Sequence, residues 1–457
     1  MTLRGEPHCW CLPLALVVIE LAACGGEEPE PSAATPHGVS ASVSESVATV
    51  VRVEWATDEP TTGYVRFGPT DDLAHRTPTE AEPTREHSRV LLGLTADTRY
   101  LYEVVSVGTG ATSGVGSIET GPLPGGMPTL TRRGDGHDLF TVVPVLGATT
   151  AVLILDPQGR VVWYHQDDRA LDFYRARLSR DGSSLLYNAA SVSGDPADDS
   201  ELVRVSLDGS SSSSVAVPLL AHDFVELPDG TLAAIAVEYI EFDGTSLRSD
   251  GIVEIDPAGE VSEVWHATDC FDPAEVQGDD SAQGWTLANA LDYDDAEDAY
   301  YLGMRNLGSI TKIDRASGAC QWVLGGAAST FDFAAGSARF LHQHQFDVVG
   351  NHILVFDNDG SLESESRVLE YELDFDASIA TEVWSYVAQP AVSSFVLGEA
   401  TRLQGGDTFV NWSMAGQLER VTAAGESIWQ LNTGVGFAFG FHTLAESLYG
   451  RGASSPP

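Results

Sequence analysis

Two closely spaced histidines are the residues of this chain most open to chemistry near neutral pH. The segment from Phe340 to Gly360 reads FLHQHQFDVVGNHILVFDNDG, in which His342 and His344 are each followed by glutamine. A neutral imidazole can act as a nucleophile, a general acid or base, or a metal ligand. It can also serve as a structural hydrogen-bonding group at the start of a β-hairpin, and the spacing of the pair leaves these alternatives open.

Three segments of the chain carry polar side chains directly before a pair of expected strands. They read LAHDFVELPDG, WTLANALDYDDAEDAYYLGMRN and LHQHQFDVVGN, and they contain His222, Asn289, Arg305 and the His342/His344 pair. Each of these side chains alone has an ordinary structural explanation, as a loop hydrogen-bonding group, an ion-pair partner or a turn residue. Their joint significance depends on the elements that position them.

A repeat supplies those elements. Each unit is an alternating strand, a turn usually containing Asp or Gly, and a second strand usually ending in tryptophan, and the units recur roughly every 48 to 60 residues. The six units are VLILDPQGRVVWY (152–164), LVRVSLDGSSSSSVAV (202–217), IVEIDPAGEVSEVW (252–265), ITKIDRASGACQW (310–322), VLEYELDFDASIATEVW (368–384) and LERVTAAGESIWQL (418–431). Further strand pairs such as FVELPDGTLAAIAV lie between them. Four strands per repeat predict a six-bladed β-propeller over residues 138–450.

Equivalent positions in successive blades of a propeller converge on its axis. We therefore expect His222, Asn289, Arg305 and one histidine of the pair to share one pocket, although they are far apart in sequence. Function on this fold usually resides there, in the loops and innermost strands near the central channel.

The region before the repeat predicts a separate β-sandwich over residues 39–122. VVRVEW and GYVRFG alternate on either side of a DEPTTG turn. The later stretch VLLGLTADTRYLYEVVSV resembles a fibronectin type III domain, in which a leucine and a tyrosine (here Leu94 and Tyr100) fix a corner of the sandwich. Residues 123–137 are interpreted as a linker.

The N-terminus indicates export and lipid anchoring. An apolar run too short for a stable transmembrane helix ends in Leu-Ala-Ala-Cys24, which resembles the lipobox of bacterial lipoproteins. Residues 1–24 are thus expected to be a lipoprotein signal peptide and residues 25–38 a flexible tether; a plain secretory signal is the alternative. The absence of Asp after Cys24 favours the outer membrane in a Gram-negative host. Cys270 and Cys320 could then form a disulfide in an oxidising compartment.

Composition excludes several functions. The chain has 67 acidic and 24 basic residues and a net charge of −43, which argues against nucleic acid or an anionic membrane surface as a partner and fits solubility in high salt. No cysteine/histidine spacing typical of zinc is present, and the runs DYDDAEDA and FDNDG lack EF-hand spacing, so they are interpreted as solvated turns. A metal-dependent hydrolase is disfavoured, and no cofactor is expected.

Several motifs in the right order resemble bacterial arylsulfotransferases across about residues 130–450. They are HDFVELPDGTLAAIA, the Trp-x-x-x-Asn segment, YLGMRNLGSITKIDRASGACQWVLGG, QHQFDVVGNHILVFDN, SRVLEYELD…VWSY and FGFHTLAESLY. The resemblance implies a secreted six-bladed propeller, commonly preceded by a β-sandwich. It also implies transfer of sulfate from a phenolic ester to a phenol acceptor, without a nucleotide donor.

Residue by residue, the resemblance implies a role for four side chains. His344 matches the nucleophile, which becomes sulfated in a ping-pong reaction, and His222 matches the general acid/base. Arg305 and Asn289 match the donors to the sulfuryl oxygens; the planar guanidinium of an arginine suits such a group.

One position departs from the family pattern. Where the family has histidine in Trp-x-His-x-Asn, this chain has Leu287, which can neither donate a hydrogen bond nor carry charge. The protein could be slow, could use His342 instead, or could be a catalytically impaired propeller that binds a ligand or protein at the cell surface. The sequence does not indicate an oligomeric state.

Overall fold

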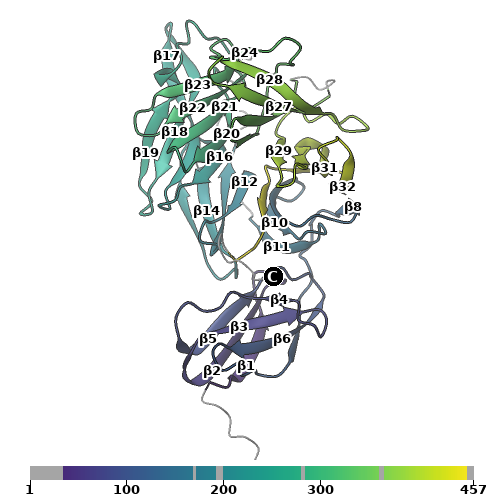
Figure 1. Ribbon diagram of the computed structural model, residues 1–457. Coiled ribbons are helices and arrows are strands. Elements are labelled where there is room, and N and C mark those ends of the chain that lie inside the picture. Colours follow the sequence, from purple (N-terminus) through teal and green to yellow (C-terminus); the bar gives the residue numbers. More distant parts are fainter. Residues whose placement is uncertain (1–33, 168–170, 192–198, 279–283, 360–364, 450–457) are drawn as a thin grey trace, which may run out of the picture.

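The computed structural model describes residues 34–167, 171–191, 199–278, 284–359 and 365–449. Within them the protein is all-β, apart from two 3-10 turns, η1 (Ala267–Asp269) and η2 (Ser413–Ala415). Two sheets of the N-terminal region lie at one end of the molecule, and six further sheets are grouped at the other (Figure 1).

The N-terminal region consists of two antiparallel sheets that enclose an apolar core. In order across each sheet, the strands are β1 (His37–Val43), β2 (Val51–Thr61) and β5 (Thr84–Leu91), and β4 (His75–Arg76), β3 (Gly63–Gly68), β6 (Arg99–Ser106) and β7 (Gly116–Glu119). The alternating apolar residues of VVRVEW and GYVRFG face each other in this core, as their period of two requires. The hydroxyl of Tyr100 accepts a hydrogen bond from the backbone N–H of Thr95 at 3.0 Å, beside the buried Leu94.

Six sheets follow, which we number 1 to 6 in chain order. Sheet 1 contains β11 (Val161–Gln166), β10 (Ala151–Leu155), β9 (Phe140–Gly147), β33 (Phe437–Phe439) and β34 (Thr443–Ala445); sheet 2 contains β12 (Asp172–Leu178), β13 (Ser184–Ala190), β14 (Glu201–Ser206) and β15 (Ser212–Ala216). Sheet 3 contains β16 (Leu220–Glu226), β17 (Leu232–Phe242), β18 (Thr245–Ile255) and β19 (Val261–His266); sheet 4 contains β20 (Ala288–Asp294), β21 (Ala299–Met304), β22 (Ser309–Asp314) and β23 (Cys320–Gly325). Sheet 5 contains β24 (Asp332–Phe333), β28 (Ile379–Tyr386), β27 (Arg367–Asp374), β26 (His352–Asp357) and β25 (Phe346–Val349); sheet 6 contains β29 (Glu399–Arg402), β30 (Thr408–Asn411), β31 (Gln417–Val421), β32 (Ser427–Asn432) and β8 (Thr131–Arg133).

Each of the six repeat units forms an antiparallel hairpin in one of these sheets, from β10–β11 in sheet 1 to β31–β32 in sheet 6. The Asp/Gly turns explain why. Asp156 accepts hydrogen bonds from the backbone N–H groups of Gln158 and Arg160 at 3.0 and 2.8 Å, and Gly159 adopts the positive φ that closes the turn. Asp256 binds two backbone N–H groups in the same way in sheet 3.

The two ends of this region are joined to each other. β8 comes before sheet 1 in the chain but pairs with β32 of sheet 6, whereas β33 and β34 follow sheet 6 and pair with β9 of sheet 1. The linker expected over residues 123–137 therefore contains an ordered strand. Backbone pairing could not be read from Thr131–Arg133 because the partner strand is about 300 residues away in the sequence.

The N-terminal sheets contact the first of the six sheets directly. The backbone N–H of Ala48 donates to the Tyr164 hydroxyl at 2.8 Å, and the Thr49 hydroxyl donates to the carbonyl of Val162 at 2.8 Å. Arg52 of β2 also forms an ion pair with Asp208, in the turn between β14 and β15. These bonds connect the N-terminal region to sheets 1 and 2.

Candidate active site

A buried polar network brings the six sheets together at one place. Asp223 on β16 accepts hydrogen bonds from Arg175 of β12 at 2.9 Å and from Gln345, directly before β25, at 2.8 Å. Arg175 also donates to Glu399 of β29 at 3.0 Å, and the same carboxylate accepts the backbone N–H of His442 at 2.6 Å. Because His442 lies between β33 and β34 of sheet 1, five of the sheets meet in these bonds.

Sheet 4 joins the network through β20. The backbone N–H of Leu291 donates to Asp223 at 3.1 Å, and the carbonyl of Asn289 accepts from the Gln345 amide at 3.1 Å. Burial by itself raises the pKa of Glu399, but Arg175 and His442 outweigh it and lower that pKa to about 2. The network thus contains ionised groups that compensate one another, which makes it a rigid platform for the segments around it.

His344 lies beside this network and is held by Asn358. The His344 ring is buried, and its Nδ1 lies 2.8 Å from Oδ1 of Asn358. The Asn358 amide nitrogen donates to the carbonyl of Leu397 at 2.7 Å, which fixes Oδ1 as the atom that faces the histidine. His344 therefore donates through Nδ1, and its lone pair is on Nε2.

His222 is the second imidazole of the site. Its ring centroid lies 6.2 Å from that of His344, and its Nδ1 has no hydrogen-bond partner among the described residues. Burial is the main cause that lowers the pKa of His222 to about 4. The positive charges of Arg248 and, more weakly, Arg305 also lower this pKa, whereas the negative charge of Asp223 raises it. Burial, the neighbouring His222 and Arg305 also hold the pKa of His344 well below its usual value. Both rings are therefore neutral at pH 7.

Asn289 lies on β20 of sheet 4, and Arg305 lies in the turn directly after β21 of the same sheet. The backbone N–H of Arg305 donates to the carbonyl of Leu287 at 3.0 Å, and its guanidinium donates to Asn306 at 2.9 Å. Asn289 is fully buried, and its amide nitrogen donates to the carbonyl of Gln343 at 2.8 Å. Its Oδ1 has no partner in the described part of the chain.

The four residues expected to share a pocket are thus connected to one another. His222 and His344 contact directly, Asn289 binds the residue before His344, and the charge of Arg305 acts on both imidazoles. Aromatic side chains border the two rings: Tyr174 lies 5.5 Å from His222 and Phe441 lies 6.3 Å from His344, centroid to centroid.

Leu287 and His342 occupy matching backbone positions. Leu287 has φ +44° directly before β20, and His342 has φ +54° two residues before His344. Leu219 and Leu397 adopt the same left-handed conformation before β16 and β29. The same left-handed backbone conformation therefore recurs before the inner strands of sheets 3 to 6. The side chain of Leu287 is buried. The backbone of His342 forms a hydrogen bond that favours the protonated form of His344.

One interpretation of the sequence was wrong. The FDNDG run was interpreted as a solvated turn, but Asp357 and Asn358 are fully buried. Asp357 forms an ion pair with Arg367 at 2.8 Å and accepts the backbone N–H of Leu341 at 2.9 Å.

Sequence reasoning also missed Asp223, Gln345 and Glu399 as members of the central network. Asp223 lies three residues into β16, Gln345 directly before β25 and Glu399 at the first position of β29, so no shared sequence offset identified them.

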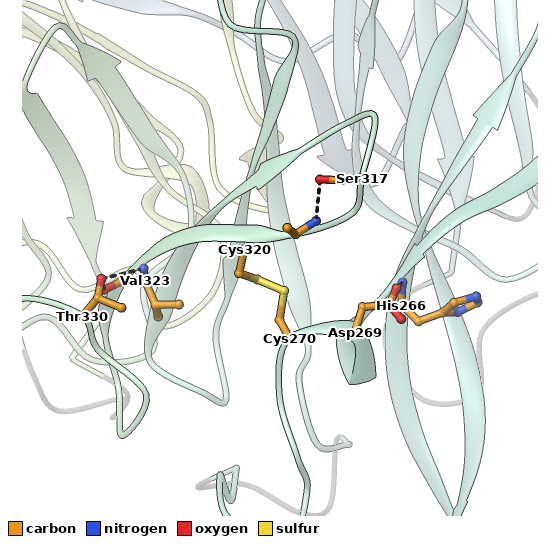
Figure 2. The surroundings of a disulfide bond; sticks show 8 residues. His266, Asp269, Cys270, Ser317, Cys320, Val323 and Thr330 are labelled. Atoms are coloured by element: carbon orange, nitrogen blue, oxygen red, sulfur yellow. Dashed lines mark hydrogen bonds between the residues drawn. A yellow bond between two sulfur atoms is a disulfide. The ribbon is translucent and has the colours of Figure 1, made fainter.

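The two cysteines expected to pair form a disulfide in the structure. Cys270 follows η1 at the end of sheet 3, and Cys320 begins β23 of sheet 4, with their Cα atoms 5.9 Å apart. Figure 2 shows this bond, with His266 and Asp269 near Cys270. The backbone N–H of His266 donates to Asp269 at 2.9 Å. The proposed lipidation site, Cys24, lies outside the described residues.

Among the described residues, no helix is long and apolar enough to cross a bilayer. Nor do they contain a group of three or more His, Cys, Asp or Glu side chains arranged to hold a metal ion.

Comparisons with known proteins place this chain in a family. A model of the family described as arylsulfotransferase (ASST) matches residues 133–435. No curated protein sequence matches the chain. Solved structures with a similar fold include a protein of unknown function from Bacteroides caccae (12% identity, TM-score 0.44, covering 68% of this chain and 100% of that one). Others are the β-propeller domain of Cps50 (Swd1) from Myceliophteria thermophila (12%, 0.38, 66% and 88%) and the periplasmic gluconolactonase of Pseudomonas aeruginosa (15%, 0.40, 77% and 95%).

Proposed function

The chain belongs to the arylsulfotransferase family, and we propose that it transfers a sulfuryl group from an aryl sulfate to a phenol through a sulfated His344. The observation that carries this proposal is the pair of buried, neutral imidazoles at 6.2 Å, with Nδ1 of His344 bonded to Asn358. Such a ring has its nucleophilic nitrogen free of a proton near neutral pH.

In the first half-reaction, Nε2 of His344 attacks the sulfur of the ester. The N–S bond forms as the bond between sulfur and the aryl oxygen breaks, and the phenolate leaves with that electron pair. Arg305 and Asn289 are suited to donate hydrogen bonds to the sulfuryl oxygens, because a charged and a neutral donor on one strand pair can face a three-oxygen group. The product is an N-sulfated imidazolium that keeps its Nδ1 proton bonded to Asn358.

In the second half-reaction, a phenol oxygen attacks the sulfur and the N–S electron pair returns to Nε2. His222 takes the phenol proton, for which a pKa of about 4 leaves it unprotonated at pH 7. Because its pKa is about 4, His222 then releases this proton to solvent, and the phenolate released by the donor takes up one proton from solvent. Each turnover therefore leaves His222 and His344 as they began.

We also propose that sheets 1 to 6 are the six blades of a propeller, because one polar network joins residues of all six sheets and strands from both chain ends join sheets 1 and 6. The N-terminal sheets are taken as a fibronectin type III-like sandwich, which the Leu94 and Tyr100 corner supports.

The direct test is mass analysis of the protein after incubation with 4-nitrophenyl sulfate. We expect a sulfuryl adduct on the peptide that contains His344, lost when phenol is added with formation of phenyl sulfate. His344→Ala should form no adduct and should remain folded by circular dichroism. Folded wild-type protein that neither forms an adduct nor releases 4-nitrophenol would refute the enzymatic proposal.

Leu287 favours a second candidate, a propeller that has kept the pocket but lost turnover. In that case the protein would bind aryl sulfates or other ligands at the cell surface without reacting. Binding of 4-nitrophenyl sulfate to wild-type protein, with no adduct over hours, would support this alternative over the first.

For localisation we propose a lipid anchor on Cys24 that holds the protein to a bacterial membrane outside the cytoplasm, in the periplasm or at the cell surface, from the lipobox pattern alone. Expression of the full chain in a bacterium that processes lipoproteins should place it in the membrane fraction. Cys24→Ser should move it to the soluble fraction, and equal partitioning of both forms would contradict the anchor.

A further inference from the structure

The β17–β18 hairpin of sheet 3 is long and reaches the segment that carries Leu287. Both strands have 11 residues and stay in register to the tip, where Phe242 faces Thr245. Arg248 lies on β18 opposite Tyr239, and Asp250 lies two residues further on, so their side chains share one face of the hairpin.

That face packs against residues 284–288 of sheet 4. The carbonyl of Arg248 accepts the backbone N–H of Trp285 at 2.8 Å. The side-chain stem of Arg248 lies over Gly284, where an added Cβ would come within 3.1 Å of the arginine Cγ. The hairpin is therefore fixed against this segment at two points before Leu287.

Asp250 fixes the segment on both sides of Leu287. Its carboxylate accepts the Thr286 hydroxyl at 2.5 Å and the backbone N–H of Ala288 at 2.8 Å. Arg248 and Asp250 lie on the same side of β18, so the Arg248 side chain projects from the face that holds residues 286–288, and its Nε is buried.

The charge of Arg248 is felt at the centre of the site. Among the charged groups that lower the pKa of His222, Arg248 has the larger effect and Arg305 the smaller one. Arg248 on β18 of sheet 3 and Arg305 in the turn after β21 of sheet 4 thus act on the same buried imidazole.

On the basis of the proposed sulfuryl transfer, we propose that Arg248 donates hydrogen bonds to the sulfuryl oxygens and supplies the donor that Leu287 lacks. A guanidinium has five N–H donors in a planar fork, so one side chain can replace the histidine donor and also add positive charge. The departure at Leu287 is then compensated from the neighbouring sheet, and the site remains a two-arginine site for a sulfate ester.

The test measures single-turnover sulfation of His344 by 4-nitrophenyl sulfate in Arg248→Gln and Arg248→Lys. The matched control is Arg315→Gln, which removes an arginine bonded to Glu254 on the same strand, away from the pocket. We expect Arg248→Gln to slow sulfation by about 10²–10³-fold, as for the loss of one donor to a transition-state oxyanion. Arg248→Lys should keep part of the rate, and Arg315→Gln should keep nearly all of it.

Two further readouts separate this role from a purely structural one. Leu287→His should restore much of the rate in Arg248→Gln but add little to the wild type, because the two donors serve the same oxygens. NMR titration should show a higher His222 pKa in Arg248→Gln than in Arg315→Gln, because a nearby positive charge has been removed.

A second arm measures the binding of 4-nitrophenyl sulfate to His344→Ala, which cannot react. Adding Arg248→Gln should weaken that binding, whereas adding Arg315→Gln should not. If wild-type protein is sulfated and Arg248→Gln reacts as fast as Arg315→Gln, the role of Arg248 is wrong and the proposed function stands. If wild-type protein is not sulfated and His344→Ala binds no aryl sulfate, both proposals fall.

Discussion

At the residue scale, the proposed chemistry depends on which nitrogen of His344 holds the proton. Asn358 decides this: its amide nitrogen is bound to the carbonyl of Leu397, so only its oxygen can face the ring. The nucleophilic Nε2 is therefore set by a residue that need not contact the substrate. Asn358 is a positioning residue in this sense.

We expect Asn358→Ala to lower the rate of His344 sulfation by about 10²–10⁴-fold, by analogy with the loss of an imidazole-orienting partner in other enzymes. Asn351→Ala is a suitable control, because Asn351 is an exposed asparagine in the turn of the same hairpin. Asn358→Asp should instead raise the pKa of His344, because a carboxylate favours the imidazolium. Its rate would then fall at a higher pH than that of the wild type. An Asn358→Ala protein as fast as Asn351→Ala would contradict the assignment.

The pH dependence of sulfation follows from the lowered pKa of His344. A lowered pKa keeps the imidazole neutral, and so nucleophilic, to a more acidic pH than the ordinary value of 6.5. Single-turnover rates should therefore be unchanged as the pH falls through 6.5 and should decrease only well below it. Near-UV circular dichroism at each pH checks that the protein stays folded. A half-maximal rate near pH 6.5 would show that His344 is not shielded as described.

At the element scale, the short segment before each inner strand is the feature that positions the side chains of the site. Leu219, Leu287, His342 and Leu397 share a left-handed backbone one to four residues before the inner strands of sheets 3 to 6. The residue two positions later is Ala221, Asn289, His344 or Glu399. One backbone design thus presents different side chains to the same central region, which is how a repeated fold builds an asymmetric site.

The disulfide is the element-scale contact with the clearest effect on stability. It closes a separation of 50 residues between sheets 3 and 4, for which chain entropy predicts a stabilisation of about 4 kcal/mol. We expect Cys320→Ser to lower the unfolding temperature in differential scanning calorimetry. A reducing agent should lower the unfolding temperature of the wild type similarly and have no effect on the variant. Equal unfolding temperatures without reductant would show that the bond does not stabilise the fold.

At the scale of the whole molecule, charge is the dominant property. With 67 acidic and 24 basic residues, the folded chain repels itself, and this repulsion is screened over about 10 Å at 0.1 M salt and about 3 Å at 1 M. The central network does not add to this repulsion. Its carboxylates, Asp223 and Glu399, are bonded to Arg175, the Gln345 amide and the backbone N–H of His442.

We therefore expect the unfolding temperature to rise as sodium chloride is increased from 0.01 to about 1 M, in keeping with screening of self-repulsion. Potassium chloride and choline chloride should act alike if the effect is screening rather than binding of one cation. Thermal unfolding followed by circular dichroism measures this. A flat or falling unfolding temperature would mean that the surface charge does not limit stability.

The sequence by itself determined the local structure and the family. Alternating strands, Asp/Gly turns and terminal tryptophans depend on neighbouring residues, so all six repeat units could be located as hairpins. The same regularity indicated that His222, Asn289, Arg305 and His344 stand at equivalent positions. The gap at Leu287 was also visible from the sequence.

Only the tertiary structure decided what surrounds these residues. The burial of Asp357 and Asn358, the pairing of β8 with β32 and the approach of Arg248 to residues 284–288 all join segments distant in the chain. Local patterns cannot show such contacts, because a short polar run has the same composition whether it ends in solvent or meets another sheet. The tautomer of His344 and the charge that acts on His222 come from those long-range contacts, and they distinguish a histidine at a hairpin from a candidate nucleophile.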